Sequence, residues 1–210
     1  MNIQKHVLEE LFYLQFQMPE YVLGIVKNEV EELKNNKFEG AHPYNYSLAG
    51  AIEHEYVLFK SAEVIDDFFS HDRFFTRGKR LKLAYSTKSH GKVMPSLWAN
   101  FQKKHEFNPI HNHDGDVSFV LWLNIPYSLK DETSLPHARS GTAPTAPAFI
   151  FLYTPIMASP YAPIHHYHIE VDKTFEGKCI VFPSKLQHMV TPFYTSDDFR
   201  ISVSGNFNLV

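Results

Sequence analysis

The spacing of apolar residues changes about a third of the way along the chain. Between residues 19 and 40, apolar side chains recur every three or four positions, which predicts a helix that begins at Pro19 or Glu20. The same spacing predicts a second helix over residues 56–69. From residue 81 onward the period falls to two, which is typical of strands. The expected strands are residues 81–85, 96–103, 117–125, 149–153, 165–171, 178–182 and 200–204, separated by Pro, Gly and Asp turns.

Seven strands after two helices predict a mainly β fold with N-terminal helices. The closest fold is a double-stranded β-helix, a cupin-like jelly roll, buttressed by helices. At 210 residues the chain suits one domain, 1–210, with residues 1–80 as the helical buttress and residues 81–210 as the β core. Residues 128–147 are rich in Ser, Thr, Pro and Ala, and such a long loop fits a lid or a tolerated insertion about equally well.

Composition narrows the class of protein. Hydrophobic residues make up 44% and charged residues 20%, which is typical of globular domains. The net charge of −3 argues against a nucleic-acid partner. The single cysteine, Cys179, excludes an intrachain disulfide. The sequence shows neither a secretory leader nor an apolar run long enough to cross a bilayer. We therefore expect a cytoplasmic protein without a membrane partner. Aromatic residues expected at the surface are compatible with a homodimer: Tyr44, Tyr46 and Tyr161.

The pattern of histidines carries the candidate chemistry. His111 and His113 stand at i, i+2 before a tight turn and an apolar strand, so their imidazoles share one strand face. His188 follows the strand at residues 178–182, where a second strand end can approach the first. Three ligands on one face of a metal ion leave positions open for substrate and oxygen, as in non-haem iron(II) oxygenases. The spacing therefore predicts a mononuclear metal site made by His111, His113 and His188.

Arg200 is the fourth candidate. It alternates with Ser202 and Ser204, so all three share one face of the last predicted strand. An inward-facing guanidinium needs an anion, and a carboxylate suits its planar fork. The alternative is a surface arginine paired with Asp197 or Asp198. On the strand at residues 96–103, Asn100 alternates with Trp98 and Gln102 and is a candidate to hydrogen-bond a cosubstrate at the barrel mouth.

Three blocks of sequence together resemble a known superfamily. They are His-x-His with the strand Ser-Phe-Val-Leu-Trp-Leu-Asn-Ile-Pro after a short turn, then Glu-Gly-Lys-Cys-Ile-Val-Phe-Pro-Ser-Lys-Leu-Gln-His, then Arg-Ile-Ser-Val-Ser-Gly-Asn. Over residues 95–208 the chain is similar to the iron(II)/2-oxoglutarate-dependent dioxygenases, above all to uncharacterised oxygenases of tailed phages and marine viruses. A viral origin would place the protein in the host cytoplasm.

The resemblance implies an oxygenase that couples oxidative decarboxylation of 2-oxoglutarate to substrate oxidation. Carried onto this chain, it implies His111 and His188 as Fe(II) ligands, and Arg200 with Ser202 as the site for a 2-oxoglutarate carboxylate. Asn100 is added as a third cosubstrate contact, and no catalytic residue beyond the metal ligands is expected. The substrate is unknown and fits either a small molecule or a protein side chain.

The chain departs from the superfamily at one ligand. The usual first motif is His-x-Asp, whereas this chain has His113 at the position of the aspartate. An all-histidine set is the first explanation, favoured because i, i+2 geometry is direct. Asp116 or Asp114 from the following turn is an alternative carboxylate ligand, and a site that has lost its iron is the third explanation.

Two further alternatives stay open. A second cluster at His165, His166 and His168 could form a rival metal site, although histidine-rich strands more often line polar pockets or face solvent. The same fold also fits a cupin-like three-histidine metalloenzyme that does not use 2-oxoglutarate, or a non-catalytic jelly-roll binding or structural protein.

Overall fold

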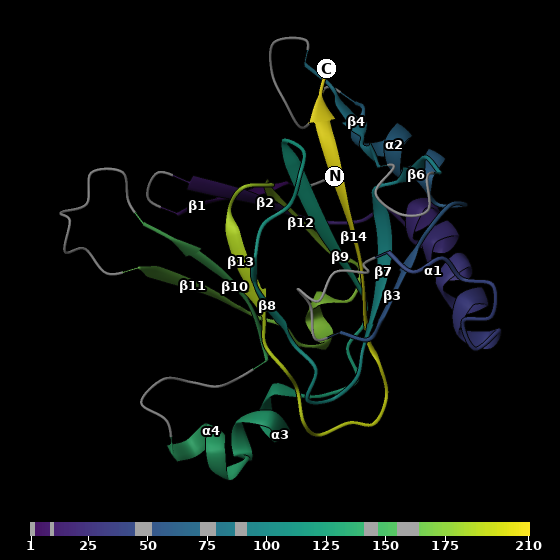
Figure 1. The fold of residues 1–210 in the computed structure, drawn as a ribbon. Coiled ribbons are helices and arrows are strands. Elements are labelled where there is room, and N and C mark those ends of the chain that lie inside the picture. Colours follow the sequence, from purple (N-terminus) through teal and green to yellow (C-terminus); the bar gives the residue numbers. More distant parts are fainter. Residues whose placement is uncertain are drawn as a thin grey trace.

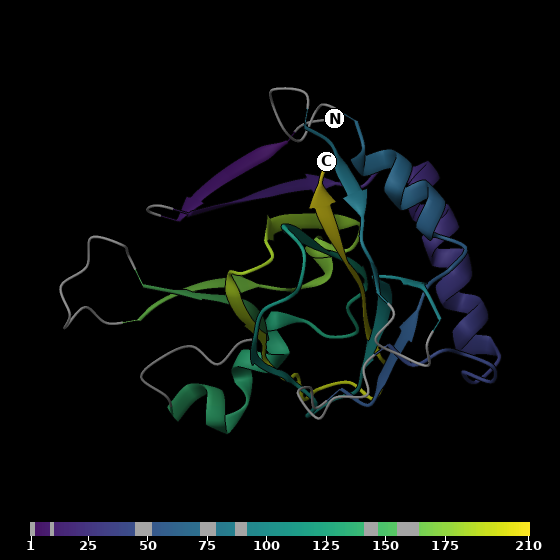
Figure 2. The same cartoon turned by 45° about the horizontal axis from the view of Figure 1, so that its top comes forward.

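Two facing antiparallel sheets form the centre of the molecule (Figure 1). The computed structural model describes residues 3–8, 11–44, 52–71, 79–86, 92–140, 147–154 and 164–210. Figure 2 turns the same view and shows helices α1 (Glu20–Asn35) and α2 (Ala62–Phe69) lying together along one side of the sheets. The arrangement confirms the expected mainly β jelly roll buttressed by helices.

The large sheet has eight strands. In spatial order, seven of them are β1 (Gln4–Leu8), β2 (Leu11–Gln17), β12 (Lys178–Pro183), β9 (Val117–Asn124), β14 (Arg200–Leu209), β7 (Leu97–Gln102) and β3 (His54–Val57). The eighth, β4 (Leu81–Leu83), pairs with the C-terminal part of β14, beyond the part that pairs with β7. The long strand β14 thus contacts three neighbours.

The small sheet has four strands, in the order β11 (His165–Glu170), β10 (Ala148–Tyr153), β13 (Gln187–Val190) and β8 (Asn108–His111). Two short strands, β5 (Tyr85–Ser86) and β6 (Met94–Pro95), form a separate pair. A 3-10 turn at Lys173–Phe175 leads into β12. All seven strand regions expected from the sequence are present, and β8 and β13 are additions that place His111 and His188 within strands.

The central strands are buried on both faces, and their side chains alternate between two cores. On β12, Cys179 and Val181 belong to the core under the helices. Ile180 and Phe182 belong to the core between the sheets. Because neighbouring strand residues point to opposite faces, a continuous apolar run is what a strand covered on both sides requires.

The N-terminal third is only partly the helical buttress expected. Helix α1 is confirmed, but the segment before it forms β1 and β2, and β2 pairs with β12. The second expected helix is shorter than predicted, because His54–Val57 is strand β3 and the helix starts at Ala62. Strands β2 and β3 gain their hydrogen bonds from partners far along the sequence, which local helical spacing does not report.

The expected loop at residues 128–147 contains two short helices, α3 (Leu129–Ser134) and α4 (Pro136–Ser140). Buried Glu132 of α3 accepts hydrogen bonds from the backbone N–H groups of Tyr194 and Thr195, which ties this segment to the chain before β14. Tyr44 is half-buried and stacks on Trp98, so it is not the exposed residue expected, whereas Tyr46 and Tyr161 lie outside the described residues. Within the described part of the chain, no helix has the length and apolar character needed to cross a membrane.

Candidate metal centre

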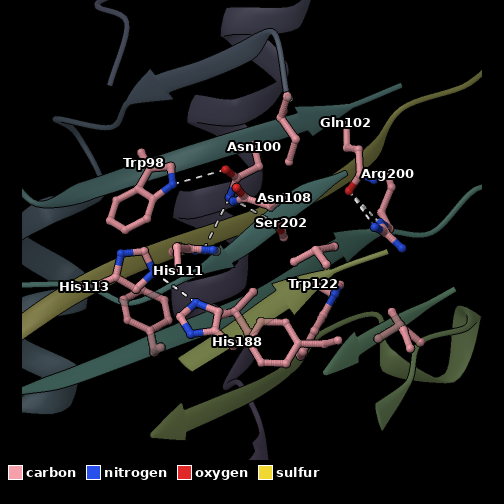
Figure 3. Close-up of a pocket in the computed structure, with 18 of the residues that line it drawn as sticks. Trp98, Asn100, Gln102, Asn108, His111, His113, Trp122, His188, Arg200 and Ser202 are labelled. Atoms are coloured by element: carbon pink, nitrogen blue, oxygen red, sulfur yellow. Dashed lines mark hydrogen bonds between the residues drawn. The ribbon is translucent and has the colours of Figure 1, made fainter. Parts of the chain in front are cut away.

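A pocket lies between the two sheets and draws its walls from both (Figure 3). From the large sheet come the inward-facing residues of β7 and β14, which are Trp98, Asn100, Gln102, Arg200, Ser202 and Ser204. The small sheet contributes Asn108, His111 and His188, and His113 follows β8. Figure 3 shows the three histidines together at one end of the pocket and Arg200 at the other.

The structure brings His111, His113 and His188 together. One ligand atom from each ring lies within 4.8 Å of the others. His111 and His188 are direct partners in the β8–β13 ladder, and their ring centroids are 4.2 Å apart. The Nε2 atoms of His113 and His188 are 3.2 Å apart. Three imidazoles at these distances can coordinate one ion.

Backbone carbonyls orient two of the rings. Nδ1 of His111 lies 2.6 Å from the carbonyl oxygen of Pro109, and Nδ1 of His188 lies 2.9 Å from that of Leu186. A carbonyl only accepts, so Nδ1 carries the proton and donates it in both rings. In a neutral imidazole this leaves the lone pair on Nε2, which is the atom available to a metal.

Burial keeps the three histidines neutral. Loss of water around the ring lowers the pKa of His111 and lowers that of His113 to about 3. Burial, aided by the two neighbouring rings, holds the pKa of His188 well below its ordinary value. Metal ligands must be deprotonated, so this environment prepares all three rings for coordination.

Neither candidate carboxylate joins the histidines. Oδ2 of Asp116 accepts a hydrogen bond from the backbone N–H of Leu209 at 2.9 Å. The exposed carboxylate of Asp114 lies 3.8 Å from Nζ of Lys185. Among the described residues, the donor group therefore consists of three histidines, as the all-histidine explanation requires.

Arg200 is 3% exposed and makes no ion pair within the described chain. Its Nε and Nη2 donate to Oε1 of Gln102 at 3.1 and 2.6 Å, and Nη2 also donates to the carbonyl oxygen of Thr191 at 2.7 Å. Nη1 donates to the hydroxyl of Tyr127 at 2.8 Å. The alternative of a surface arginine paired with Asp197 or Asp198 is wrong, because Arg200 is buried and makes no ion pair among the described residues; Asp197 pairs with Lys104.

Asn100 and Ser202 lie between the two ends of the pocket. Nδ2 of Asn100 donates to Oγ of Ser202 and to Oγ of Ser204, each at 3.3 Å. Oδ1 of Asn100 accepts from Nε1 of Trp98 at 3.1 Å. These contacts give the pocket a polar floor along β7 and β14, as the alternation of residues in both strands predicts.

The sequence placed Gln102 on the same strand face as Asn100, but it connected none of the three partners with Arg200. Gln102 shares the inward face of β7 with Asn100, so the period of two was a usable signal for it. Tyr127 and Thr191 lie outside the strands, and no pattern in the sequence connects them with Arg200. The rival cluster on β11 consists of His165, His166 and His168. Within the described chain none of these three joins a group of three metal-ligating side chains, and His166 and His168 are exposed.

The comparisons with known proteins agree with this geometry. Residues 96–206 match the model of a family described as "Putative 2OG-Fe(II) oxygenase", where 2OG is 2-oxoglutarate. The chain belongs to this family. It is a non-haem iron oxygenase, and the cofactors of the family are Fe(II) and 2-oxoglutarate.

A solved structure extends the likeness to the whole fold. A prolyl-4-hydroxylase from Pseudomonas putida aligns with 96% of this chain and 94% of its own, at a TM-score of 0.51 and 15% sequence identity. At that identity the match supports the fold alone. No match was found among curated proteins.

Proposed function

We propose that His111, His113 and His188 hold Fe(II), and that Arg200, with Ser202 and Asn100, binds the far carboxylate of 2-oxoglutarate. The oxygenase family sets the chemistry, and this proposal assigns its parts to residues. When bound, Fe(II) and 2-oxoglutarate couple decarboxylation of the keto acid to oxidation of a substrate by dioxygen. The protein supplies ligand geometry, an anion site and a pocket shielded from water.

The observation that carries the proposal is a buried guanidinium whose described partners are all neutral. Removing a charge from water costs on the order of several kcal/mol unless an opposite charge compensates it. Gln102, Tyr127 and the Thr191 carbonyl satisfy hydrogen bonds of Arg200 but contribute no negative charge. A dicarboxylate that reaches from the histidines to Arg200 supplies that charge.

The arginine also separates the proposal from its rivals. A cupin-like metalloenzyme without 2-oxoglutarate accounts for the three histidines but leaves the buried charge of Arg200 without a role. A non-catalytic jelly roll accounts for neither. The cost of burying Arg200 therefore favours the 2-oxoglutarate-dependent site.

Anaerobic titration with Fe(II) and then 2-oxoglutarate tests the assignment. At 2-oxoglutarate concentrations near the wild-type Kd, the wild type should develop the weak visible absorption band of the keto acid chelated to Fe(II), and Arg200→Ala and His188→Ala should both lack it. His168→Ala is the matched control, because it removes an exposed histidine away from the pocket. Iron binding without the band would favour the cupin-like alternative, and a wild type that binds no iron would favour the non-catalytic protein.

Four other predictions from the sequence stay predictions. They are a single domain over residues 1–210, a cytoplasmic location, a closer relationship to viral oxygenases, and a homodimer. The family gives this enzyme a substrate of unspecified class, and we propose either a small molecule or a protein side chain. The neutral polar floor of the pocket is compatible with both.

A further inference from the structure

His113 differs from the other two histidines in how it is held. His111 and His188 are strand residues that face each other across one ladder. His113 lies two residues beyond the end of β8, in the turn that leads to β9, where no ladder fixes it. A loop side chain is held less exactly than one on a strand unless its surroundings fix the loop.

The backbone of His113 is fixed by a neighbouring turn. Its N–H donates to the carbonyl oxygen of Ser184 at 2.9 Å. Its own carbonyl oxygen accepts from Nζ of Lys185 at 3.0 Å. The Ser184 N–H in turn donates to the carbonyl oxygen of Asp116 at 3.1 Å, so the two turns are joined in both directions. The position of His113 therefore depends on the position of Ser184.

Ser184 is anchored by a chain of buried polar side chains. Oγ of Ser118 donates to Oδ1 of Asn206 at 2.7 Å. That commits the only hydroxyl proton of Ser118, so in its 2.8 Å contact with Ser184, Ser184 is the donor. Nδ2 of Asn206 then donates to Oγ of Ser96 at 2.9 Å. None of the four side chains is more than 6% exposed.

The turn between β8 and β9, which carries His113, packs closely against β14. Gly115 has φ of +89°, and a Cβ built there would lie 2.9 Å from the carbonyl oxygen of Phe207. Asp116 N–H donates to that carbonyl oxygen at 2.9 Å, and the Asp116 carboxylate accepts from Leu209. A glycine is needed here because the chain is left-handed and in close contact with another backbone. Asp116 thus serves to hold the turn.

We propose that Ser184, Ser118 and Asn206 are positioning residues for His113. The hydrogen-bond chain fixes the turn at residues 183–185 to β9 and β14, and this turn sets where the imidazole of His113 lies relative to His111 and His188. The inference rests on the proposed role of His113 as a metal ligand. It explains why a chain of hydroxyl and amide groups is buried where apolar side chains would pack without needing partners.

Ser118→Ala tests the inference, because it removes one oxygen and breaks the chain between Ser184 and Asn206. The matched control is Ser61→Ala, which removes an equally buried hydroxyl that donates to Glu29 outside the pocket. Co(II) alone is the probe, added to each purified protein without oxygen or 2-oxoglutarate. We expect Ser118→Ala to weaken Co(II) binding by about tenfold or more and to alter its visible spectrum, as loss of outer-shell partners of metal ligands does. Ser61→Ala should leave both unchanged.

A double-mutant cycle shows whether the effect passes through His113. In a His113→Ala background, which keeps His111 and His188, adding Ser118→Ala should leave the remaining Co(II) affinity unchanged. An equal loss in both backgrounds would overturn the inference, as would a Ser118→Ala protein with wild-type affinity and spectrum. Ser184→Ala repeats the test if Ser118→Ala does not fold. A wild type that fails to bind Co(II) would instead count against the proposed metal site itself.

Discussion

The histidine end of the pocket is assembled from two segments that are distant in the sequence, β8 with the turn after it and β13, whereas Arg200 at the other end stands on one strand. The histidines are neutral, and burial lowers the pKa of each. Arg200 is charged, and its contacts with Gln102, Tyr127 and Thr191 leave that charge uncompensated. One end therefore depends on the exact relative placement of its groups, and the other depends on an anion.

The difference also concerns charge. Three neutral rings add nothing to the charge of a bound Fe(II), so the site carries one more positive charge than a site with an aspartate ligand. In the proposed site a dianionic cosubstrate contributes to both ends at once, because one carboxylate meets Arg200 while the keto acid group meets the metal. Under this proposal the two ends are distinct in construction and share one ligand, so each can be perturbed alone.

The largest effect is expected at the histidine end from His188→Ala. His188 is 2% exposed, and its Nδ1 is fixed by Leu186. Removing it takes away a ligand, so Fe(II) or Co(II) affinity should fall by more than the ~10–100-fold typical of outer-shell changes. Anaerobic metal titration measures this. Oxygenase activity that survives in His188→Ala would contradict the metal assignment.

Arg200→Ala should act on the other end alone. We expect the Kd for 2-oxoglutarate to rise by about 30-fold, corresponding to about 2 kcal/mol, because a buried charge pair is lost. Co(II) affinity without 2-oxoglutarate should stay at the wild-type value, and the effect on folding should be much smaller than that on cosubstrate binding. Isothermal titration of 2-oxoglutarate into the Co(II)-loaded protein gives the first quantity, titration of Co(II) into the metal-free protein gives the second, and thermal unfolding gives the third.

A Gln102→Glu change sharpens the comparison by adding a charge at the arginine end. The new carboxylate would sit where Oε1 of Gln102 accepts two hydrogen bonds from Arg200, and it would neutralise the guanidinium internally. We expect 2-oxoglutarate affinity to fall about tenfold, or about 1.4 kcal/mol.

Gln102→Met controls for the lost hydrogen bonds, since it has similar size and no charge. It should weaken 2-oxoglutarate binding less than Gln102→Glu does. Equal effects of the two substitutions would mean that the neutrality of Gln102 is irrelevant to the cosubstrate.

Ser202→Ala is expected to have the smallest effect. A neutral hydrogen bond contributes about 1 kcal/mol, so 2-oxoglutarate affinity should fall by about fivefold. Ser204→Ala is the comparison, since it removes the other hydroxyl that accepts from Asn100 at the same 3.3 Å. If Ser204→Ala costs as much affinity as Ser202→Ala, the loss comes from Asn100 and not from a contact with the cosubstrate.

Short-range patterns in the sequence predicted much of this site. The alternation of Arg200 with Ser202 reports side-chain direction directly, because a strand has a period of two. The same argument placed the imidazoles of His111 and His113 together, and they are together, although His113 lies in the turn after β8 and is held there by contacts that the period does not report. The pairing of β2 with β12 and the contacts of Arg200 with Tyr127 and Thr191 join residues that are distant in sequence or lie in loops. Such groups come together only in the folded chain, so the local spacing of apolar and polar residues does not predict these contacts.

Strand β14 carries Arg200, Ser202, Ser204 and Asn206 on its inner face, from the anion site to the network behind His113. The spacing between these side chains is regular, because every two residues of a strand advance about 6.6 Å along it. Substituting one side chain leaves this spacing unchanged, whereas inserting one residue would turn every later side chain of the strand to the other face. The spacing of Arg200, Ser202 and Ser204 along the pocket is consequently set by the backbone of β14, and substituting one of these side chains should leave the other two at their positions.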